Sequence, residues 1–311
     1  MADKKTILAP TSLLVALSVA LSLLVNPVAD AAPKKTLKLL WSHEFNLKKG
    51  TLPSSKNWSR EIGGGGWGNS ERQYYTDKAA NASMDGAGRL IITANRISNE
   101  YAEQVGEVSG TEDILNRCSE CQFTSARMKT ARNIGFMYGQ IEVRMKLPQG
   151  VGTWPAFWML GGDLLDGVPW PECGEIDIME YVGEKDWIGV AMHGPKYSGE
   201  TPFVDRFYFP PGEDATGWHV YAAEWKKDSV EFYIDDRLTY RVTRPMVEHY
   251  GNWVFDNPEH VIVNFALGGA YPVKNNTAKQ PYPGLPLATA ERIKRGELSM
   301  EVDWVRVYAP R

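Results

Sequence analysis

Three acidic residues lie within six positions of one another in the segment Gly174–Tyr181, which reads Gly-Glu-Ile-Asp-Ile-Met-Glu-Tyr. Residues two apart in a β-strand share a face, so Glu175 and Asp177 point the same way while the two isoleucines point to the opposite face. Plain alternation would put Glu180 with the isoleucines, but a β-bulge near Met179 adds one residue and restores the parity. The spacing therefore predicts a bulged strand with three carboxyl groups in one row.

Such a row of carboxyl groups has the composition needed to cleave a glycosidic bond. Two glutamate side chains that lean toward each other can bring their carboxyl groups to about 5–5.5 Å, the separation typical of glycosidases that retain the anomeric configuration. Because ionising one carboxyl disfavours ionising the next, at least one pKa in the row is raised. One glutamate can then attack the sugar while the other protonates the leaving group. The alternative is an acidic, solvent-facing edge strand.

The elements expected to hold this row are short runs rich in β-branched and aromatic residues. They are bounded by Gly, Pro, Asn or Asp and lie at residues 89–95, 138–147, 174–181, 218–225, 230–235, 261–267 and 300–308. Strict apolar alternation over residues 140–147 indicates a half-buried strand, and Asp235-Asp236 predicts a hairpin turn. Many antiparallel strands without helix–strand alternation predict an all-β fold, a jelly-roll sandwich of two curved sheets with a substrate cleft on its concave face.

The N-terminal segment differs from the rest of the chain. Lys4 and Lys5 precede an apolar stretch from Leu13 to Val25 and a small-x-small pattern at Ala29-Asp30-Ala31. This pattern predicts a cleaved signal peptide over residues 1–31, followed by a single catalytic domain over residues 32–311. A membrane anchor is the alternative, although the stretch is shorter than the roughly 20 residues that span a bilayer. We therefore expect a secreted or periplasmic protein without stable membrane insertion.

Bulk composition limits the classes of partner. The chain has 311 residues, of which 43% are hydrophobic, and its formal net charge is −4, so it has no basic footprint for nucleic acid. We expect a monomer that acts on a polysaccharide. The cysteines are Cys118, Cys121 and Cys173, and their odd count leaves at least one free thiol or an intermolecular pairing. Cys118 and Cys121 are spaced to close a small disulfide loop; a zinc pair is the alternative, for which no histidine lies nearby.

Several motifs taken together resemble glycoside hydrolase family 16, in particular its laminarinase (endo-1,3-β-glucanase) branch. They include segments 41–46, 66–76, 125–130, 138–144, 154–160, 170–171, 174–180, 192–194 and 302–308. The resemblance implies that Glu175 is the nucleophile, that Asp177 supports it and that Glu180 is the acid/base, without a catalytic cofactor. It also implies hydrolysis of β-1,3-glucan, with mixed-linkage β-1,3-1,4-glucan as a second substrate.

Substrate-binding residues follow partly from chemistry and partly from the resemblance. Pyranose rings stack well on indole, which makes cleft candidates of Trp67, Trp154 and Trp158. The resemblance adds Asn69, Arg127, His193 and Asn264 as polar contacts. Trp158 in the core and His193 as a structural histidine are the alternatives. The resemblance further implies a structural calcium ion held by backbone oxygens of Glu44 and Gly88 and by the side chain of Asp303.

Two departures from the family pattern concern the shape of one cleft end. His43 stands where the family usually has aspartate, and the segment Arg117–Cys121 differs from the expected loop. Three other functions remain open on the same fold: a β-glucan transglycosylase, a galactan-cutting relative that acts on agar or carrageenan, and a non-catalytic glucan-binding protein. Retention of both Glu175 and Glu180 argues against the last.

Overall fold

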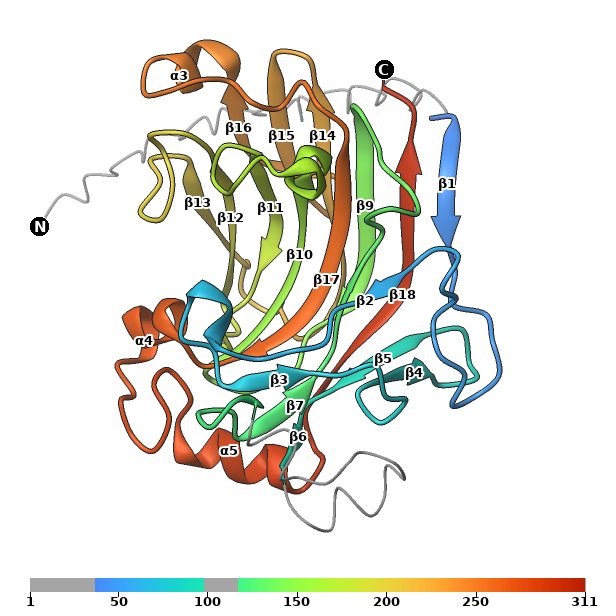
Figure 1. The fold of residues 1–311 in the computed structure, drawn as a ribbon, viewed down its shortest axis with the longest axis vertical. Coiled ribbons are helices and arrows are strands. Elements are labelled where there is room, and N and C mark those ends of the chain that lie inside the picture. Colours follow the sequence, from blue (N-terminus) through green and yellow to red (C-terminus); the bar gives the residue numbers. More distant parts are fainter. Residues whose placement is uncertain (1–36, 98–116, 311) are drawn as a thin grey trace, which may run out of the picture. The chain divides into compact units, whose positions relative to one another are not determined.

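Antiparallel strands dominate the computed structural model, which describes residues 37–97 and 117–310 (Figure 1). The expected signal peptide at residues 1–31 lies outside the described residues. Residues 37–311 group into one unit. Two large sheets and one small sheet build it.

The first large sheet has eight strands in the order β16-β15-β14-β9-β18-β5-β4, with β1 paired to β18. Every neighbouring pair in it is antiparallel. Its strands are β1 (Leu39–His43), β4 (Ala82–Met84), β5 (Leu90–Thr93), β9 (Gly139–Lys146), β14 (Trp218–Lys226), β15 (Ser229–Ile234), β16 (Arg237–Thr243) and β18 (Ser299–Tyr308).

The second large sheet has seven strands in the order β13-β12-β11-β10-β17-β8-β2, also all antiparallel. The acidic segment forms β11, near the middle of this sheet. Its strands are β2 (Ser59–Arg60), β8 (Arg127–Lys129), β10 (Thr153–Gly161), β11 (Glu175–Glu180), β12 (Trp187–His193), β13 (Val204–Tyr208) and β17 (Glu259–Leu267).

The remaining elements are short. A small sheet contains β3 (Gln73–Tyr75), β7 (Phe123–Ser125) and β6 (Asn95–Arg96). The helices within the described residues are η1 (Gly66–Gly68), η2 (Gly162–Asp166), α3 (Arg244–Glu248), α4 (Ala270–Asn276) and α5 (Leu287–Lys294). Within the described ranges no helix has both the length and the apolar character needed to cross a membrane.

The two large sheets pack face to face through their alternating apolar side chains. Ile141 and Val143 of β9 are 0% exposed and share one hydrophobic core with Phe157 and Met159 of β10. Full burial of one such side chain contributes about 1.5–3 kcal/mol. The other face of each strand is thereby left for ions, solvent or ligand.

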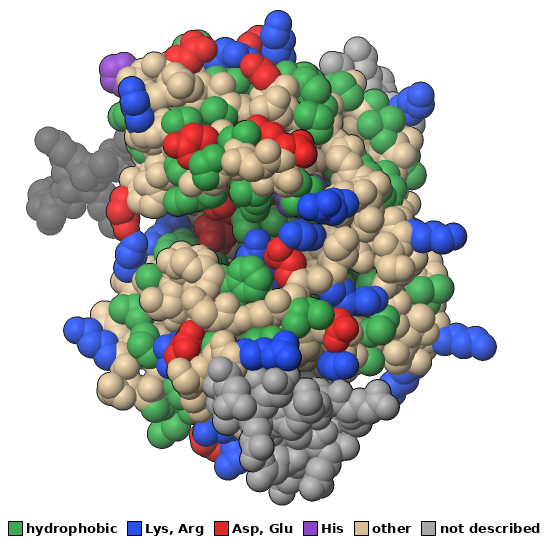
Figure 2. Space-filling view, in the orientation of Figure 1, with side chains coloured by type: hydrophobic (Ala, Val, Ile, Leu, Met, Phe, Trp, Pro, Cys, Tyr) green, Lys and Arg blue, Asp and Glu red, His purple; other side chains and the backbone are tan. Residues whose placement is uncertain are grey.

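The strands confirm the predicted all-β sandwich. Every predicted run coincides with a strand, and β15 and β16 are joined at Asp235 and Asp236, whose φ angles of 48° and 65° suit the two-residue hairpin turn. The face of the molecule seen in Figure 2 is hollowed, with acidic side chains deep in the hollow.

Candidate active site

The predicted bulge is present in β11 and lies at Ile178 and Met179. Toward β10, Asp177 pairs with Trp158 and Met179 pairs with Phe157, so Ile178 is the extra residue. Both bulge residues are buried in the core, at 1% and 0% exposed. Two consecutive apolar side chains therefore face the sandwich interior, and Glu180 returns to the face of Asp177.

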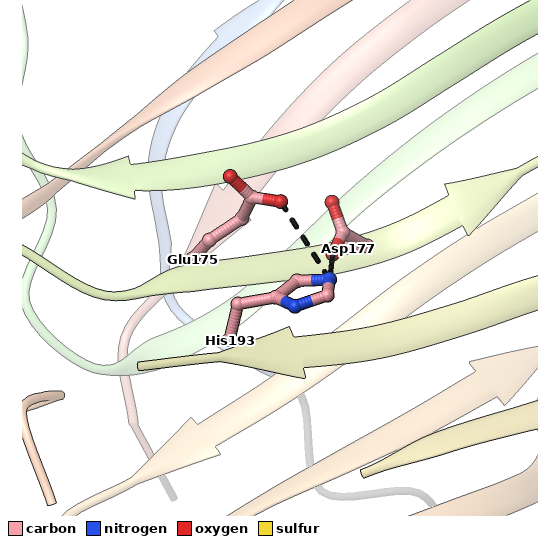
Figure 3. A group of neighbouring side chains, drawn as sticks. All are labelled: Glu175, Asp177 and His193. Carbon is pink, nitrogen blue, oxygen red and sulfur yellow. Dashed lines mark ion pairs between the residues drawn. The ribbon is translucent and has the colours of Figure 1, made fainter. Parts of the chain in front are cut away.

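Glu175 and Asp177 meet a histidine from the neighbouring strand (Figure 3). His193 pairs with Glu175 in the register of β11 and β12. Its Nε2 atom lies 3.4 Å from Asp177 Oδ2 and 3.8 Å from Glu175 Oε1. Ligand atoms of these three residues lie within 4.8 Å of one another, and among residues 37–97 and 117–310 no other group of three has the spacing of a metal site.

Two indole rings fix the two glutamates. Trp154 Nε1 donates to Glu180 Oε1 at 3.0 Å, and Trp170 Nε1 donates to Glu175 Oε2 at 3.0 Å. Trp154 is firmly held, since it belongs to a buried cluster with Trp187 and packs against Tyr271. Each glutamate thus has one carboxyl oxygen oriented by a neutral donor.

Burial raises the pKa of all three carboxyl groups, and repulsion by a neighbouring carboxylate adds to the increase for Glu175 and Asp177. Burial is the largest cause for each. The charge of Asp177 further raises the pKa of Glu175, and the charge of Glu180 further raises that of Asp177. For Glu180, His193 and the hydrogen bond from Trp154 oppose the increase. Such a cluster holds at least one proton at a pH where an isolated carboxyl would have lost it.

Small residues flank the carboxyl groups on the neighbouring strands. Ala156 of β10 pairs with Glu180, and on β12 Ala191 pairs with Asp177 and Gly189 pairs with Glu180. A Cβ atom on Gly189 would lie 3.0 Å from the hydroxyl of Tyr271, so a larger residue there would press on that ring. The lack of a side chain at Gly189 therefore admits the ring of Tyr271 beside Glu180.

A stack of aromatic and guanidinium groups lies on the β8 side of β11. Arg127 Cζ lies 4.9 Å from the ring centroid of Trp67 and 4.7 Å from that of Trp158. Trp158 Nε1 donates to Asn264 Oδ1 at 2.7 Å, and Arg127 also pairs with Glu61. The structure thus brings together four of the predicted substrate-binding residues, and their binding role remains a prediction.

The other predicted contacts are placed differently. His193 sits within the acidic cluster, whereas the exposed Asn69 donates its side-chain amide to Glu71 Oε1 at 3.3 Å. Trp170 was missing from the sequence candidates, although it lies only five positions before Glu175. A proline-rich loop gives no periodicity from which the direction of its indole could be read.

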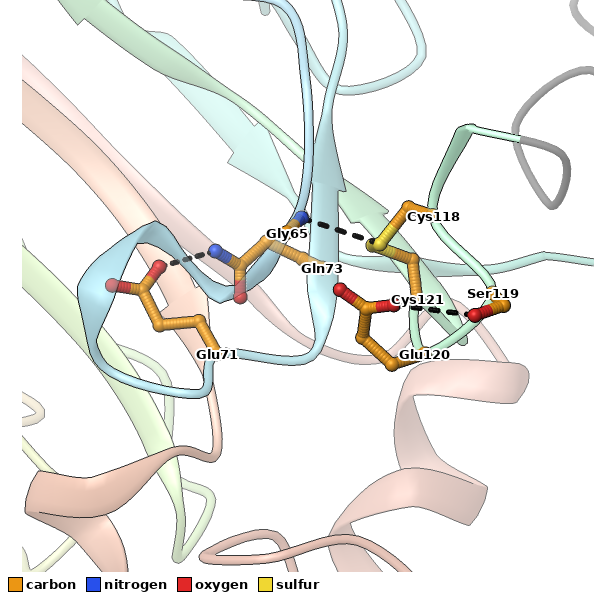
Figure 4. Close-up of a disulfide and its surroundings, with 7 residues drawn as sticks. All are labelled: Gly65, Glu71, Gln73, Cys118, Ser119, Glu120 and Cys121. Carbon is orange, nitrogen blue, oxygen red and sulfur yellow. Dashed lines mark hydrogen bonds between the residues drawn. A yellow bond between two sulfur atoms is a disulfide. The ribbon is translucent and has the colours of Figure 1, made fainter.

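The glycine-rich loop that carries Trp67 rests on a disulfide (Figure 4). Cys118 and Cys121 are bonded, which selects one of the two alternatives open from the sequence, and Cys173 is free and buried. A Cβ atom on Gly64 would lie 2.5 Å from Cys121 Sγ and 2.7 Å from Cys118 Sγ, so only glycine fits there without displacement. The amide of Gly65 also donates to Cys118 Sγ at 3.3 Å.

Comparisons with known proteins agree with this geometry. The family model described as glycosyl hydrolases family 16 matches residues 69–304. The beta-glucanase of Rhodothermus marinus is 33% identical over 313 residues, covering 98% of this chain and 96% of the relative.

Two solved structures are similar in fold as well as in sequence. The laminarinase catalytic domain of Thermotoga maritima MSB8 is 35% identical with a TM-score of 0.70, covering 88% of this chain and 99% of that one. The endo-beta-1,3-glucanase of Pyrococcus furiosus is 34% identical with a TM-score of 0.72, covering 88% and 94%. Sequence match, fold and coverage together establish that the chain belongs to glycosyl hydrolase family 16.

Proposed function

We propose that this protein is a retaining endo-glycosidase that hydrolyses β-1,3-glucan, with Glu175 as nucleophile and Glu180 as acid/base. The observation that carries the proposal is the bulge at Ile178 and Met179, which puts both glutamates on the face of Asp177. The names of the similar proteins, laminarinase and endo-beta-1,3-glucanase, support the substrate.

In the first step the ionised carboxylate of Glu175 attacks the anomeric carbon while Glu180 gives its proton to the glycosidic oxygen. The glycosidic bond breaks, the leaving sugar departs as an alcohol, and a covalent glycosyl-enzyme forms. In the second step Glu180 takes a proton from water, whose oxygen attacks the same carbon and releases Glu175. No cofactor takes part, as is general for family 16 glycosidases.

The neighbouring groups support this division of roles. Trp170 holds one oxygen of Glu175 and leaves the other free to attack. Asp177 and His193 lie beside Glu175, with His193 Nε2 3.4 Å from Asp177 Oδ2 and 3.8 Å from Glu175 Oε1, so polar groups face the nucleophile. Burial raises the pKa of Glu180, which suits a group that must hold a proton for the leaving group. The pKa of Glu175 is raised as well, so the division of roles rests on the positions of the two glutamates and on the family resemblance and not on their pKa values.

The activity is tested by a product profile on laminarin, lichenan, agarose and xyloglucan, followed by proton NMR of the first anomer released. We expect laminarin to be cleaved fastest, lichenan more slowly, and the new reducing end to appear first as the β-anomer. An initial α-anomer would contradict the retaining mechanism. Preference for agarose would move the protein to the galactan-cutting relatives.

We also propose a structural calcium ion at Glu44, Gly88 and Asp303. Asn46 Oδ1 lies 2.9 Å from the place of a Cβ on Gly88, which adds an oxygen donor at this position. Arg144 donates to Asp303 Oδ2 at 2.5 Å and uses only one oxygen of that carboxylate. These oxygen donors suit calcium. Calcium should raise the Tm of the wild type but not of Asp303→Asn, and a chelator should reverse the increase.

Export from the cytoplasm is part of the same proposal, because glucan polymers are met outside the cell interior. It depends on residues 1–31 acting as a cleaved leader. Mass spectrometry of the protein purified from medium or periplasm should give an N-terminus after Ala31. A full-length protein that stays with the membrane fraction would contradict the cleavage.

A further inference from the structure

A buried carboxylate outside the acidic row receives three hydrogen bonds. Glu71 is 5% exposed and follows η1, in the segment that leads into β3. Gln73 Nε2 donates to its Oε2 atom at 2.5 Å and the hydroxyl of Tyr75 donates to the same oxygen at 3.3 Å. Asn69 Nδ2 donates to Oε1 at 3.3 Å. The carboxylate is therefore surrounded by neutral donors.

A chain of hydrogen bonds links Glu71 to the indole of Trp158 on β10. Trp158 Nε1 donates to Asn264 Oδ1 at 2.7 Å, and Asn264 Nδ2 donates to the hydroxyl oxygen of Tyr75 at 3.0 Å. Indole can only donate, so the orientation of the Asn264 amide is fixed. The proton of the Tyr75 hydroxyl is then left for Glu71. All donors point along one direction, and the chain ends on the carboxyl group of Glu71, which accepts at both of its oxygens.

The same chain holds both sides of the Arg127 stack. The ring of Tyr75 contacts the ring of Trp67 with centroids 5.4 Å apart, while its hydroxyl holds Asn264 and through it Trp158. Arg127 lies between the two indoles. We call Trp67, Arg127 and Trp158 the indole platform.

The platform segment is also tied to the end of a central strand. Gln73 Oε1 accepts a hydrogen bond from the backbone amide of Leu267, the last residue of β17, at 2.8 Å. Gln73 is 0% exposed and its amide nitrogen is the donor nearest to Glu71. The position of Glu71 is thus set from two strands that are far apart in the sequence.

We propose that Glu71 is a positioning residue for substrate: its carboxylate orients Tyr75 and Asn264, and through them the indole platform that binds the glucan on the β8 side of the catalytic strand. This inference rests on the proposed function. Glu71 is not a catalytic residue, because its contacts are with side chains that hold the platform. Loss of the Glu71 carboxylate should weaken binding of the ground state and of the transition state equally. Such a change raises KM and leaves kcat nearly unchanged.

Two substitutions cut the chain at neighbouring links. In Glu71→Gln the new amide group must place N–H atoms against donors from Gln73 or Tyr75, and Tyr75→Phe removes the hydroxyl while keeping the ring on Trp67. The matched control is Tyr221→Phe, which deletes an equally buried hydroxyl, 0% exposed, from β14 of the eight-stranded sheet.

Kinetics on defined β-1,3-gluco-oligosaccharides separate positioning from a general loss of structure. We expect Glu71→Gln and Tyr75→Phe each to raise KM about tenfold with kcat within about threefold of the wild type. The KM of the double variant should exceed that of the more impaired single variant by no more than about twofold, because both changes interrupt the same chain of hydrogen bonds. Tyr221→Phe should leave both constants unchanged.

An unchanged KM in a folded Glu71→Gln, or a fall in kcat alone, would overturn the inference. If Glu71→Gln does not fold, Tyr75→Phe decides by the same criterion. The affinity of the wild type and of each variant for the oligosaccharide, measured by calorimetry, distinguishes this inference from the proposed function. If the wild type cleaves no β-1,3-glucan the proposed function fails, whereas cleavage with equal affinities in wild type and Glu71→Gln removes only the role of Glu71.

Discussion

The two large sheets share one core and differ in how their outer faces carry charge. On the eight-stranded sheet, opposite charges pair at the surface, as between Arg144 and Asp303 at 2.5 Å and between Arg89 and Glu301 at 3.1 Å. On the seven-stranded sheet, Glu175, Asp177 and Glu180 are like charges in one row, with Asp177 4% exposed. The eight-stranded sheet thus neutralises its surface charges in ion pairs. The seven-stranded sheet holds carboxyl groups close enough to repel one another, so that they retain protons for use in the reaction.

The largest expected effect comes from removing either glutamate of the row. Glu175→Gln and Glu180→Gln should each lower hydrolysis of laminarin about a thousandfold or more, because neither the covalent bond nor the proton transfer can then form normally. The matched control is Glu301→Gln on the eight-stranded sheet, which should retain full activity. Initial rates of reducing-end release measure both. Retention of a tenth of the activity by either row variant would refute the assignment.

The two glutamates should differ in rescue. With an aryl glycoside that has a good leaving group, azide should restore turnover in Glu180→Ala, since azide attacks the glycosyl-enzyme without a general base. It should not do so in Glu175→Gln, which forms no such intermediate. Chromatography of the glycosyl azide gives the answer, and equal rescue of both variants would show that the two roles are not separated as proposed.

Trp154→Phe should lower kcat/KM about tenfold and shift the dependence of kcat/KM on pH. The indole hydrogen bond lowers the pKa of Glu180, so its removal raises that pKa. Glu180 then keeps its proton to higher pH, and the basic limb of the kcat/KM profile should move upward in pH. Trp253, equally buried at 8% exposed, donates to Asp256 instead, so Trp253→Phe should not move that limb.

A smaller effect concerns stability. The pKa of Glu175 in the folded state lies well above its ordinary value of 4.5, so the folded state binds more protons than the unfolded state between these two values. The free energy of unfolding therefore falls as pH rises through this window, and the loss is complete above the folded-state pKa. Glu175→Gln should raise the Tm at neutral pH and should change the Tm little below pH 4.5. About 1 kcal/mol corresponds to roughly 2–4 °C in a domain of this size. Calorimetric scans at both pH values test the sign.

The smallest expected effect is a loss of stability on breaking the ion pairs of the eight-stranded sheet. Glu301→Gln removes a partner of Arg89 and Lys146, all of them partly exposed to solvent. Exposed ion pairs of this kind contribute about 1 kcal/mol or less and are screened by salt. Urea unfolding at low and high salt should show a small difference that disappears at high salt. A larger, salt-independent loss would mean that this face is not simply a solvated one.

The sequence alone predicts the structure where the alternation of side chains along one strand decides which face each residue takes. Alternation placed Ile141 and Val143 of β9 in the core, and the odd spacing of Glu175 and Glu180 required a bulge, which lies at Ile178 and Met179. Both features depend only on neighbours along one strand. The separation of the two carboxyl groups, expected to be about 5–5.5 Å, stays a prediction.

Contacts between distant segments could not be predicted in this way. Tyr75 and Asn264 are 189 positions apart, and nothing in either local sequence indicates that they share a hydrogen bond. Glu71 is buried beside Tyr75, although a glutamate in a loop is ordinarily exposed, and no local pattern indicates this burial. Trp170 was missed for a related reason, since the path of a loop decides where its indole points.

The sulfur pair beneath Gly64 has a consequence for when the cleft becomes complete. Two separate thiols occupy more room than a bonded pair, and the space against Gly64 is already filled by both sulfur atoms. In a reducing compartment the freshly made chain would hold the loop of Trp67 differently. Disulfides persist in oxidising surroundings such as the periplasm or the extracellular medium. Under the proposed export, the bond between Cys118 and Cys121 would form outside the cytoplasm, and the loop of Trp67 would reach its final position only there.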